Sequence, residues 1–333
     1  MRTLRFASVL LGAAVLALGP AASASNDPSF AKQWGLQKIG AEAAWARTTG
    51  ANVKIGIVDT GVDLNHEDLA GKVVESTSCV GSDGDPAKCK GSAQDDQGHG
   101  THVSGIAAAL KDNGKGVAGV APDAKLIVAK VLEATGAGSS NDVTAGIKWV
   151  VDHGAQVVNL SLGDPAQAVT QLFGPNDLNE GVQYAWSHGA VAVVAAGNSN
   201  AAGLGLEGSS YGDLNAIIVG ATGPDDSVAS YSTDTGEAKW AVLAPGGAGD
   251  RKKEDDVYST YWKQGEKNAY GYLAGTSMAA PHVSGAIALL LAEGYTPVKA
   301  VQRLLETADP KVKCGSHSPT CHGRIDVAKA TAR

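Results

Sequence analysis

Aromatic residues, cysteines and positive charge are all scarce in this sequence. Of 333 residues, 4 are cysteine and 2 are methionine, aromatic side chains make up 5%, and 34 acidic residues outnumber 27 basic ones to give a net charge of −7. Without a basic excess, the chain has no electrostatic route to nucleic acid or to anionic lipid. Beyond residue 24, no apolar run reaches the roughly 20 residues that cross a membrane. These absences predict a soluble globular protein of one large or two small domains.

The one long apolar stretch lies at the N-terminus. Arg2 and Arg5 precede an apolar run over Phe6–Leu18, and a triplet of small residues follows at 22–24. A short apolar segment with a basic start and a small-residue end is typical of a secretory signal peptide, here residues 1–24. Its removal would take away two positive charges and change the net charge from −7 to −9. We therefore predict a secreted protein with no membrane association after cleavage.

The four cysteines form two local pairs, Cys79 with Cys89 and Cys314 with Cys321. Clustered cysteines in even number are typical of disulfides in exported proteins. A zinc site is the alternative, but neither pair has Cys-x-x-Cys spacing and the pairs lie far apart in sequence. The local pairing is favoured, although four cysteines allow three connectivities.

Short apolar runs alternate with helical patterns along most of the chain. Runs suited to buried strands occur at 53–58, 126–131, 157–161, 191–195, 217–219 and 240–243, and helical patterns occur at 103–110, 142–151, 178–186, 278–291 and 297–307. This alternation predicts the α/β class, with a three-layer, doubly wound and mostly parallel sheet covered by helices on both faces. The stretch 75–97 is rich in Gly, Ser and Asp and is predicted to be an exposed loop.

Polar residues stand where three of the predicted strands end. Asp59 follows the first run, Ser161 ends the third, and Asn198 comes shortly after the fourth. Ligands of parallel sheets bind beyond the carboxyl ends of the strands, so we expect these residues to converge. Ser277 opens a predicted helix, where the N–H groups and the dipole favour negative charge. Such a serine is either an ordinary N-cap or a nucleophile, and the rest of the chain has to decide between them.

Nucleophilic catalysis by serine needs a base, a carboxylate that orients the base, and donors for the developing oxyanion. His99 at a glycine-flanked helix start, Asp59 at a strand end and the amide of Asn198 can supply these groups around Ser277. An esterase or lipase of the α/β-hydrolase type would need Gly-x-Ser-x-Gly and the order Ser, Asp, His, and the sequence has neither. Activity should rise as His99 loses its proton near neutral pH.

Three motifs resemble the active-site signatures of subtilisin-like serine proteases, peptidase family S8. They are Asp59-Thr60-Gly61, His99-Gly100-Thr101-His102-Val103 and Gly275-Thr276-Ser277-Met278-Ala279, in the family order Asp, His, Ser. The resemblance covers most of residues 26–309. Asn26-Asp27-Pro28 and the segment 34–39 resemble the thermitase branch of the family.

This resemblance implies a secreted serine endopeptidase of broad specificity with an acyl-enzyme on Ser277. His99 would be the general base and then the acid, Asp59 its orienter, and Asn198 the oxyanion donor. Two edges would hold an extended peptide as an added strand, and small pocket walls would favour a large apolar P1 side chain. The implied substrate-binding residues are Gly136, Ser161, Leu162, Gly163, Ala196, Gly197 and Gly208.

The resemblance to the thermitase branch also implies a structural calcium ion. Oxygen ligands would come from Asp27, Asp68 and Asn113 and from the carbonyls of Leu110, Lys115 and Val117. A second ion could bind acidic residues of the loop before His99, although acidic loops are commonly just solvated; these residues are Asp83, Asp85, Asp95 and Asp96.

The chain departs from the family pattern near both ends. Catalytic-domain residues are expected from residue 25 directly after the leader, so we predict one domain over 25–333 with no separate prodomain and a short cysteine-containing tail at 310–333. We expect a monomer that acts on proteins or peptides. The alternatives are a processing protease for one precursor, for which the Cys79–Cys89 loop could add a specificity surface, and an inactive binding scaffold. His102 and His282 are expected to pack inside helices, and the surface histidines are expected to be His66, His153, His188, His317 and His322.

Overall fold

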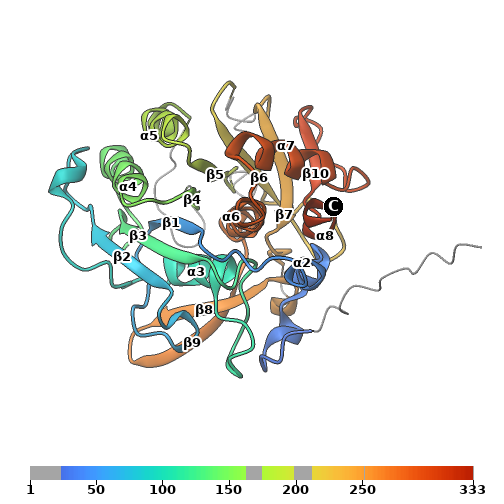
Figure 1. Cartoon of the computed structure of the whole chain (residues 1–333), viewed down its shortest axis with the longest axis horizontal. Helices are drawn as coiled ribbons and strands as arrows, with labels where there is room; N and C mark the ends of the chain where they lie inside the picture. The colour runs from blue at the N-terminus through green and yellow to red at the C-terminus, as the bar shows by residue number, and fades with distance from the viewer. Residues whose placement is uncertain (1–23, 163–174, 199–211, 251, 333) are drawn as a thin grey trace, which may run out of the picture.

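A parallel sheet of eight strands forms the middle of the molecule (Figure 1). The computed structural model describes residues 24–162, 175–198, 212–250 and 252–332. The strand order is β10-β7-β6-β5-β4-β1-β3-β2, and every neighbouring pair is parallel. The strands are β1 (Lys54–Asp59), β2 (Val73–Ser78), β3 (Lys125–Lys130), β4 (Val157–Leu160), β5 (Val191–Ala195), β6 (Ala216–Thr222), β7 (Trp240–Pro245) and β10 (Cys321–Arg324).

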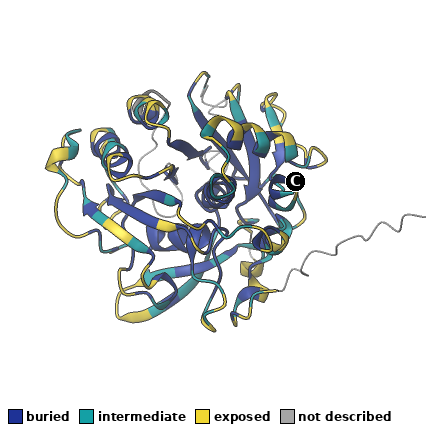
Figure 2. Cartoon of the chain, viewed as in Figure 1, coloured by how far each residue is buried: buried dark blue, intermediate teal, exposed yellow. Residues whose placement is uncertain are grey.

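Helices cover both faces of the sheet, because the strands are apolar on both sides. One core joins the sheet to the buried faces of α3 (His99–Ala108) and α6 (Thr276–Ala292). The other joins it to α4 (Ser140–Asp152) and α5 (Pro175–Ser187). Nearly every residue of α6 is buried, and Figure 2 shows this helix within the molecule. The predicted α/β class with helices on both faces is therefore confirmed.

Shorter elements close the ends of the sheet. These are η1 (Phe30–Lys32), α1 (Trp34–Lys38), α2 (Ala41–Trp45), η2 (Glu67–Leu69), η3 (Pro86–Lys88), η5 (Lys253–Asp255), α7 (Pro297–Thr307) and α8 (Val327–Thr331). Among the described residues, no helix combines the length and apolar character needed to cross a membrane.

An antiparallel hairpin packs against α3 outside the main sheet. It consists of β8 (Val257–Lys263) and β9 (Glu266–Leu273), and β9 leads almost directly into α6. The imidazole Nε2 of His102 lies 3.1 Å from the carbonyl oxygens of both Val257 and Gly271, so one buried side chain of α3 contacts both hairpin strands. His102 therefore packs inside the protein, as predicted.

Two local predictions from the sequence were wrong. The stretch 75–97 was expected to be a loop throughout, but its first residues belong to β2, an edge strand whose exposed positions are Val74 and Glu75. His66 was expected at the surface, yet it is 1% exposed, and its Nε2 lies 2.9 Å from the carbonyl oxygen of Ala269. That partner comes from β9, about 200 residues along the chain, and no local pattern could reveal it.

Candidate active site

Asp59 and His99 meet at the point where the strand order reverses. Asp59 is the last residue of β1, which lies between β3 and β4, and His99 is the first residue of α3. The Asp59 Oδ1 lies 2.7 Å from the His99 Nδ1, and the two side chains are 0% and 2% exposed. A carboxylate in this position favours the imidazole tautomer with hydrogen on Nδ1, so the Nε2 lone pair can accept a proton.

The carboxylate of Asp95 fixes the surroundings of this pair. This carboxylate is 1% exposed and accepts the backbone N–H groups of Gln97 at 3.0 Å and Gly98 at 2.9 Å. It also accepts the N–H of Thr101 at 3.0 Å and the Thr101 hydroxyl at 2.5 Å. Asp95 thereby caps the helix that begins at His99. Its Oδ1 also accepts the hydroxyl of Thr60, the residue next to Asp59, at 3.0 Å.

Glycines flank His99 because other parts of the chain approach closely there. Gly98 has φ +111°, and a Cβ on it would meet the carbonyl oxygen of Trp262 at 2.6 Å. A Cβ on Gly100 would meet the carbonyl oxygen of Gly61 at 2.1 Å. Side chains at these positions would separate α3 from the hairpin and from the end of β1.

Ser277 is the second residue of α6, so it lies at the N-terminal end of a long helix. Its carbonyl oxygen accepts the hydroxyl of Ser161 at 2.8 Å, and its own Oγ lies 3.4 Å from the carbonyl oxygen of Ser161. Asn159 donates to the Ser161 hydroxyl at 2.9 Å and accepts the Ser284 hydroxyl at 2.8 Å. All four residues are at most 1% exposed, so a buried polar chain connects the end of β4 to α6.

The side-chain amide of Asn198 is oriented by Thr276. Its Oδ1 accepts the N–H of Thr276 at 2.9 Å and the Thr276 hydroxyl at 3.1 Å, and that hydroxyl accepts the N–H of Gly197 at 3.0 Å. Because the Oδ1 is held by these donors, the Nδ2 side of the amide is left for another acceptor. An amide fixed this way beside Ser277 can donate to an oxyanion.

Comparison with known proteins identifies the family. The model of the subtilase family (Peptidase_S8) matches residues 50–323. The chain belongs to the subtilase family. It is 39% identical over 308 residues to thermitase of Thermoactinomyces vulgaris, covering 92% of this chain and 98% of that protein. It is 40% identical over 283 residues to subtilisin DY of Bacillus licheniformis, covering 83% of this chain and 90% of that protein.

A solved structure extends the similarity to the fold. It belongs to a study of proteases from Pseudoalteromonas arctica, and it superposes with a TM-score of 0.76 at 29% identity over 93% of this chain and 99% of that one. The resemblance inferred from the three motifs is therefore confirmed, and the protein is a subtilisin-like serine endopeptidase.

Most of the substrate-binding residues expected for a subtilase lie near Ser277 or at the same end of the sheet. Ser161 and Leu162 follow β4, Ala196 and Gly197 follow β5, and all four are buried. Gly136 lies in a turn with φ +75° after β3. Two further expected residues, Gly163 and Gly208, lie outside the described residues.

The side chains expected to bind calcium in this subtilase gather around one loop. Asp27 accepts the N–H groups of Asn113 at 3.1 Å and Gly114 at 3.2 Å, and Asp68 Oδ1 accepts the Asn113 Nδ2 at 2.8 Å. Asp68 Oδ2 accepts the Val117 N–H at 2.8 Å, and the Leu110 N–H donates to the Asp68 carbonyl at 2.9 Å.

The chemistry of this cluster fits a hard cation. Asp27 and Asp68 are 4% and 0% exposed, and within the described residues no ion pair joins either to a cationic side chain. Tyr270 donates to Asp68 at 2.9 Å, and burial together with the negative charges of Asp68 and Glu67 raises its pKa. Asn113 would have to turn its amide over, because its Nδ2 faces Asp68 while its Oδ1 accepts the Lys115 N–H. Two buried carboxylates, an amide and nearby carbonyls are ligands that calcium prefers.

Three of the four acidic residues suggested for a second ion have separate partners. Asp95 accepts N–H and O–H donors around the start of α3, and Asp96 pairs with Lys130 at 2.7 Å. Asp85 accepts the N–H of Ala87 within its own loop at 3.0 Å. No group of three or more metal-ligating His, Cys, Asp or Glu side chains occurs in the part of the chain that the structure describes. We therefore make no proposal for a second ion at Asp83, Asp85, Asp95 and Asp96, and that suggestion stays a prediction from the sequence.

Both predicted local disulfides are present. Cys79 joins Cys89, and Cys314 joins Cys321. The first closes a loop between β2 and α3, and the second closes a loop just before β10 at the opposite edge of the sheet. Sequence reasoning did not identify the buried residues Asn159 and Ser284 as parts of the site, and it gave Thr276 no role beyond its place in the serine motif. Each acts through partners that are distant in sequence.

Proposed function

We propose that this subtilase is a secreted endopeptidase of broad specificity whose acyl-enzyme forms on Ser277. The observation that carries the proposal is the buried 2.7 Å contact between Asp59 and His99, at the carboxyl ends of the central strands β1 and β4, where Ser161 contacts Ser277. A buried imidazole oriented by a carboxylate is the arrangement that lets a serine hydroxyl attack a peptide carbonyl.

The first half of the reaction forms the acyl-enzyme. The Ser277 Oγ attacks the carbonyl carbon while the His99 Nε2 takes the hydroxyl proton, and the imidazolium is stabilised by Asp59. The carbonyl oxygen becomes an oxyanion, to which the Asn198 Nδ2 and the N–H of Ser277 donate. The C–N bond then breaks as His99 gives its proton to the leaving amine.

The second half releases the acid product. A water molecule gives a proton to His99 and attacks the ester carbon, and the Ser277 Oγ leaves with the proton that His99 returns. His99 must therefore be neutral at the start of each half, so the rate rises as it loses its proton and stays high in mild alkali.

The substrate is proposed to bind as an extended strand between two edges. One edge would be formed by Ser161 and Leu162, which follow β4, with Gly163 outside the described residues, and the other by the segment around Gly136. Ala196, Gly197 and Gly208 would wall the P1 pocket, and such small residues leave room for a large apolar side chain.

Calcium is proposed as a structural ion. Asp27, Asp68 and the Asn113 side chain, with the carbonyls of Leu110, Lys115 and Val117, would hold it, and the bound ion would neutralise two buried carboxylates. It would stabilise the fold and take no part in the bond changes.

Export and domain organisation complete the proposal. Residues 1–24 have the pattern of a signal peptide, and residues 25–333 are proposed to form one catalytic domain, monomeric, with the cysteine-containing tail at 310–333. Two alternatives concern the role of the enzyme. A processing protease for a single precursor would show activity on few peptides, and an inactive scaffold would bind peptides without cleaving them.

Labelling with a serine-directed fluorophosphonate tests the proposal. Folded wild-type protein should be labelled, and Ser277→Ala should not. Unlabelled wild-type protein should then cleave many sequences in a peptide library, with apolar P1 residues preferred. Absence of labelling in a folded, calcium-loaded wild type would contradict the assignment of Ser277 and favour the scaffold, whereas cleavage of one sequence alone would favour the processing protease.

A further inference from the structure

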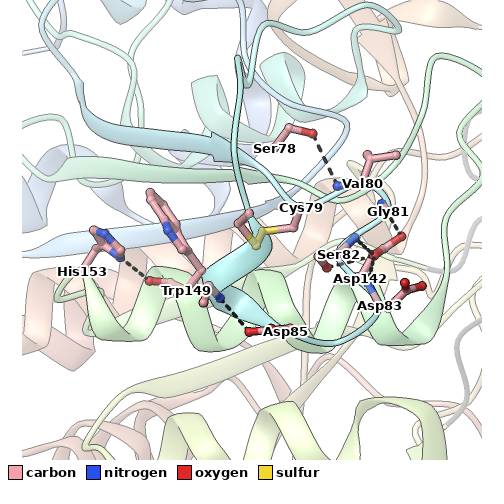
Figure 3. Close-up of a disulfide and its surroundings, with 12 residues drawn as sticks. Ser78, Cys79, Val80, Gly81, Ser82, Asp83, Asp85, Asp142, Trp149 and His153 are labelled. Atoms are coloured by element: carbon pink, nitrogen blue, oxygen red, sulfur yellow. Dashed lines mark hydrogen bonds between the residues drawn. A yellow bond between two sulfur atoms is a disulfide. The ribbon is translucent and has the colours of Figure 1, made fainter.

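The loop closed by Cys79 and Cys89 is docked onto α4 by one buried carboxylate. Asp142 is 7% exposed. Its Oδ1 accepts the N–H and the hydroxyl of Ser82, at 2.8 and 2.9 Å, and the N–H of Asp83 at 3.2 Å. Its Oδ2 accepts the N–H of Gly81 at 3.1 Å. Figure 3 shows this carboxylate pointing from the helix into the loop. Three successive N–H groups of the loop are therefore held by a single side chain.

This carboxylate is built to stay ionised. Burial alone would raise its pKa, but hydrogen bonds from Gly81, Ser82, Ser139 and Asp83 outweigh burial, and the pKa lies below its usual value. A carboxylate in the first turn of a helix also interacts favourably with the helix dipole. The loop is thus attached by charge-assisted hydrogen bonds, which are stronger than neutral ones.

The same loop is attached at a second point, on β3. The N–H of Cys79 donates to the carbonyl of Lys130, the last residue of β3, at 2.8 Å. The Cys79–Cys89 disulfide brings the end of the loop back to the same place, where the N–H of Lys90 donates to the Ser78 carbonyl at 2.7 Å. Residues 79–83 therefore connect the end of β3 to the start of α4.

Between these two attachment points lies the segment 131–139, which contains Gly136. Its first two residues are held by the Asp59 carbonyl, which accepts the N–H groups of Val131 at 2.8 Å and Leu132 at 3.3 Å. Beyond them the backbone N–H groups of the turn bond only within the turn: Glu133 donates to the Ala137 carbonyl and Gly136 to the Glu133 carbonyl, each at 2.8 Å, and Ala137 donates to the Thr135 hydroxyl at 3.3 Å. Its far end is the N-cap Ser139, whose hydroxyl accepts the N–H of Asp142 at 3.0 Å. Residues 133–135 are exposed, so the core does little to fix the tip of the turn.

We propose that the Cys79–Cys89 loop is a positioning element for substrate, which holds the segment 131–139 in the shape that pairs with the acyl side of an extended peptide. The proposal rests on the function proposed above for the edge at Gly136. A rigid edge strand loses little entropy on binding, whereas a loose one must be ordered by the substrate. The loop therefore favours peptides long enough to reach the segment, and Asp142 is a positioning residue that acts through it.

The test compares a long substrate with a short one. The long substrate is a peptide with four residues on the acyl side of the cleaved bond, and the short one is an acyl amino acid ester that fills only the P1 pocket. In the double variant Cys79→Ala/Cys89→Ala and in Asp142→Asn, kcat/KM should fall about tenfold for the peptide, or about 1.4 kcal/mol. It should change by less than about twofold for the ester. The ratio of the two values is the readout, since a general loss of folded enzyme lowers both.

The second disulfide supplies the matched control. Cys314→Ala/Cys321→Ala removes the disulfide at the other edge of the sheet, so the ratio of kcat/KM for the peptide to that for the ester should stay at the wild-type value. Asp142→Asn keeps the disulfide and the side-chain shape. If the double cysteine variant does not fold, this variant alone tests whether the loop positions the segment 131–139. An unchanged ratio in folded Asp142→Asn, or an equal fall for both substrates, would overturn the proposal. A wild type that resists fluorophosphonate labelling would instead overturn the proposed function.

Discussion

The hydroxyl of Thr60 joins the carboxylate of Asp95 to the backbone beside Asp59 and His99: it donates to Asp95 at 3.0 Å and accepts the N–H of Gly100 at 2.9 Å. Thr60 follows Asp59, and Gly100 follows His99. The hydroxyl therefore closes a ring around the contact between Asp59 and His99, and Asp95 holds the hydroxyl in place. We therefore expect Asp95 to act as a positioning residue for His99, the proposed general base.

Replacing Asp95 should slow the chemical step. In Asp95→Asn, an NH₂ group faces N–H donors of α3, so the helix start shifts and His99 loses its alignment. Misplacement of about 1 Å can cost about 100-fold, and we expect a fall of this order in kcat with little change in KM. Steady-state kinetics on a peptide substrate measure it. The control is the neighbour Asp96→Asn, whose partner Lys130 keeps two carbonyl acceptors, and an equal loss in that variant would contradict the assignment.

Two substitutions of Asn198 separate its two roles. Loss of an oxyanion-hole asparagine in a subtilisin costs about 10²- to 10³-fold in kcat, and we expect Asn198→Ala to lie in this range. Asn198→Asp keeps an oxygen for the N–H of Thr276 but replaces the donor with negative charge. It should lose at least as much activity while unfolding at a temperature nearer the wild type. Near-normal kcat in Asn198→Asp would exclude Asn198 as a donor.

Calcium removal should lower the unfolding temperature. At a calcium concentration of one hundred times Kd, a bound ion adds about 2.7 kcal/mol, which corresponds to about 4 °C for a domain of about 310 residues. The measurement is thermal unfolding of Ser277→Ala with calcium and with a chelator, because the inactive variant cannot digest itself. Adding Asp68→Asn should abolish the difference, and adding Asp123→Asn on another loop should preserve it. A full calcium effect without Asp68 would place the ion elsewhere.

Stability should fall in weak acid because two buried histidines resist protonation. Burial lowers the pKa of His282 to about 4 and that of His102 to about 3, from 6.5 in the unfolded chain. Below pH 6.5 the unfolded state therefore binds protons that the folded state does not, and the free energy of unfolding decreases as the pH falls toward 4. Each histidine contributes at most about 1.4 kcal/mol per pH unit.

The variant His282→Asn isolates one of these contributions. Asparagine can keep a donor for the Met278 carbonyl, which the His282 Nδ1 contacts at 2.8 Å, but it does not titrate. Urea unfolding in the Ser277→Ala background is measured at about pH 4.5, 5.5 and 7.5. The free energy of unfolding should fall less steeply with decreasing pH than in the parent, and the difference in slope should correspond to at most about one bound proton per molecule. Parallel decreases in the two proteins would show that His282 is not responsible.

Much of the candidate site could be predicted because its signals are local. Asp59 ends an apolar run and His99 stands between glycines that close packing requires, so short windows of sequence indicate both. The supporting residues could not be found this way. Asp95 has the appearance of a solvated loop carboxylate, and only the fold brings Thr60 to it. His66 was expected at the surface for the same reason, since its partner Ala269 lies on β9.

The candidate catalytic groups are dispersed over the whole topology. The carboxylate comes from the first strand of the sheet, the amide follows the fifth, and the nucleophile arrives on a helix that follows the outer hairpin. A partly synthesised chain that ends before α6 has no serine to attack with, and a chain whose last helices are undocked cannot align one. If the proposed site is correct, cleavage requires nearly the whole chain, so a chain that ends before α6 is expected to be inactive.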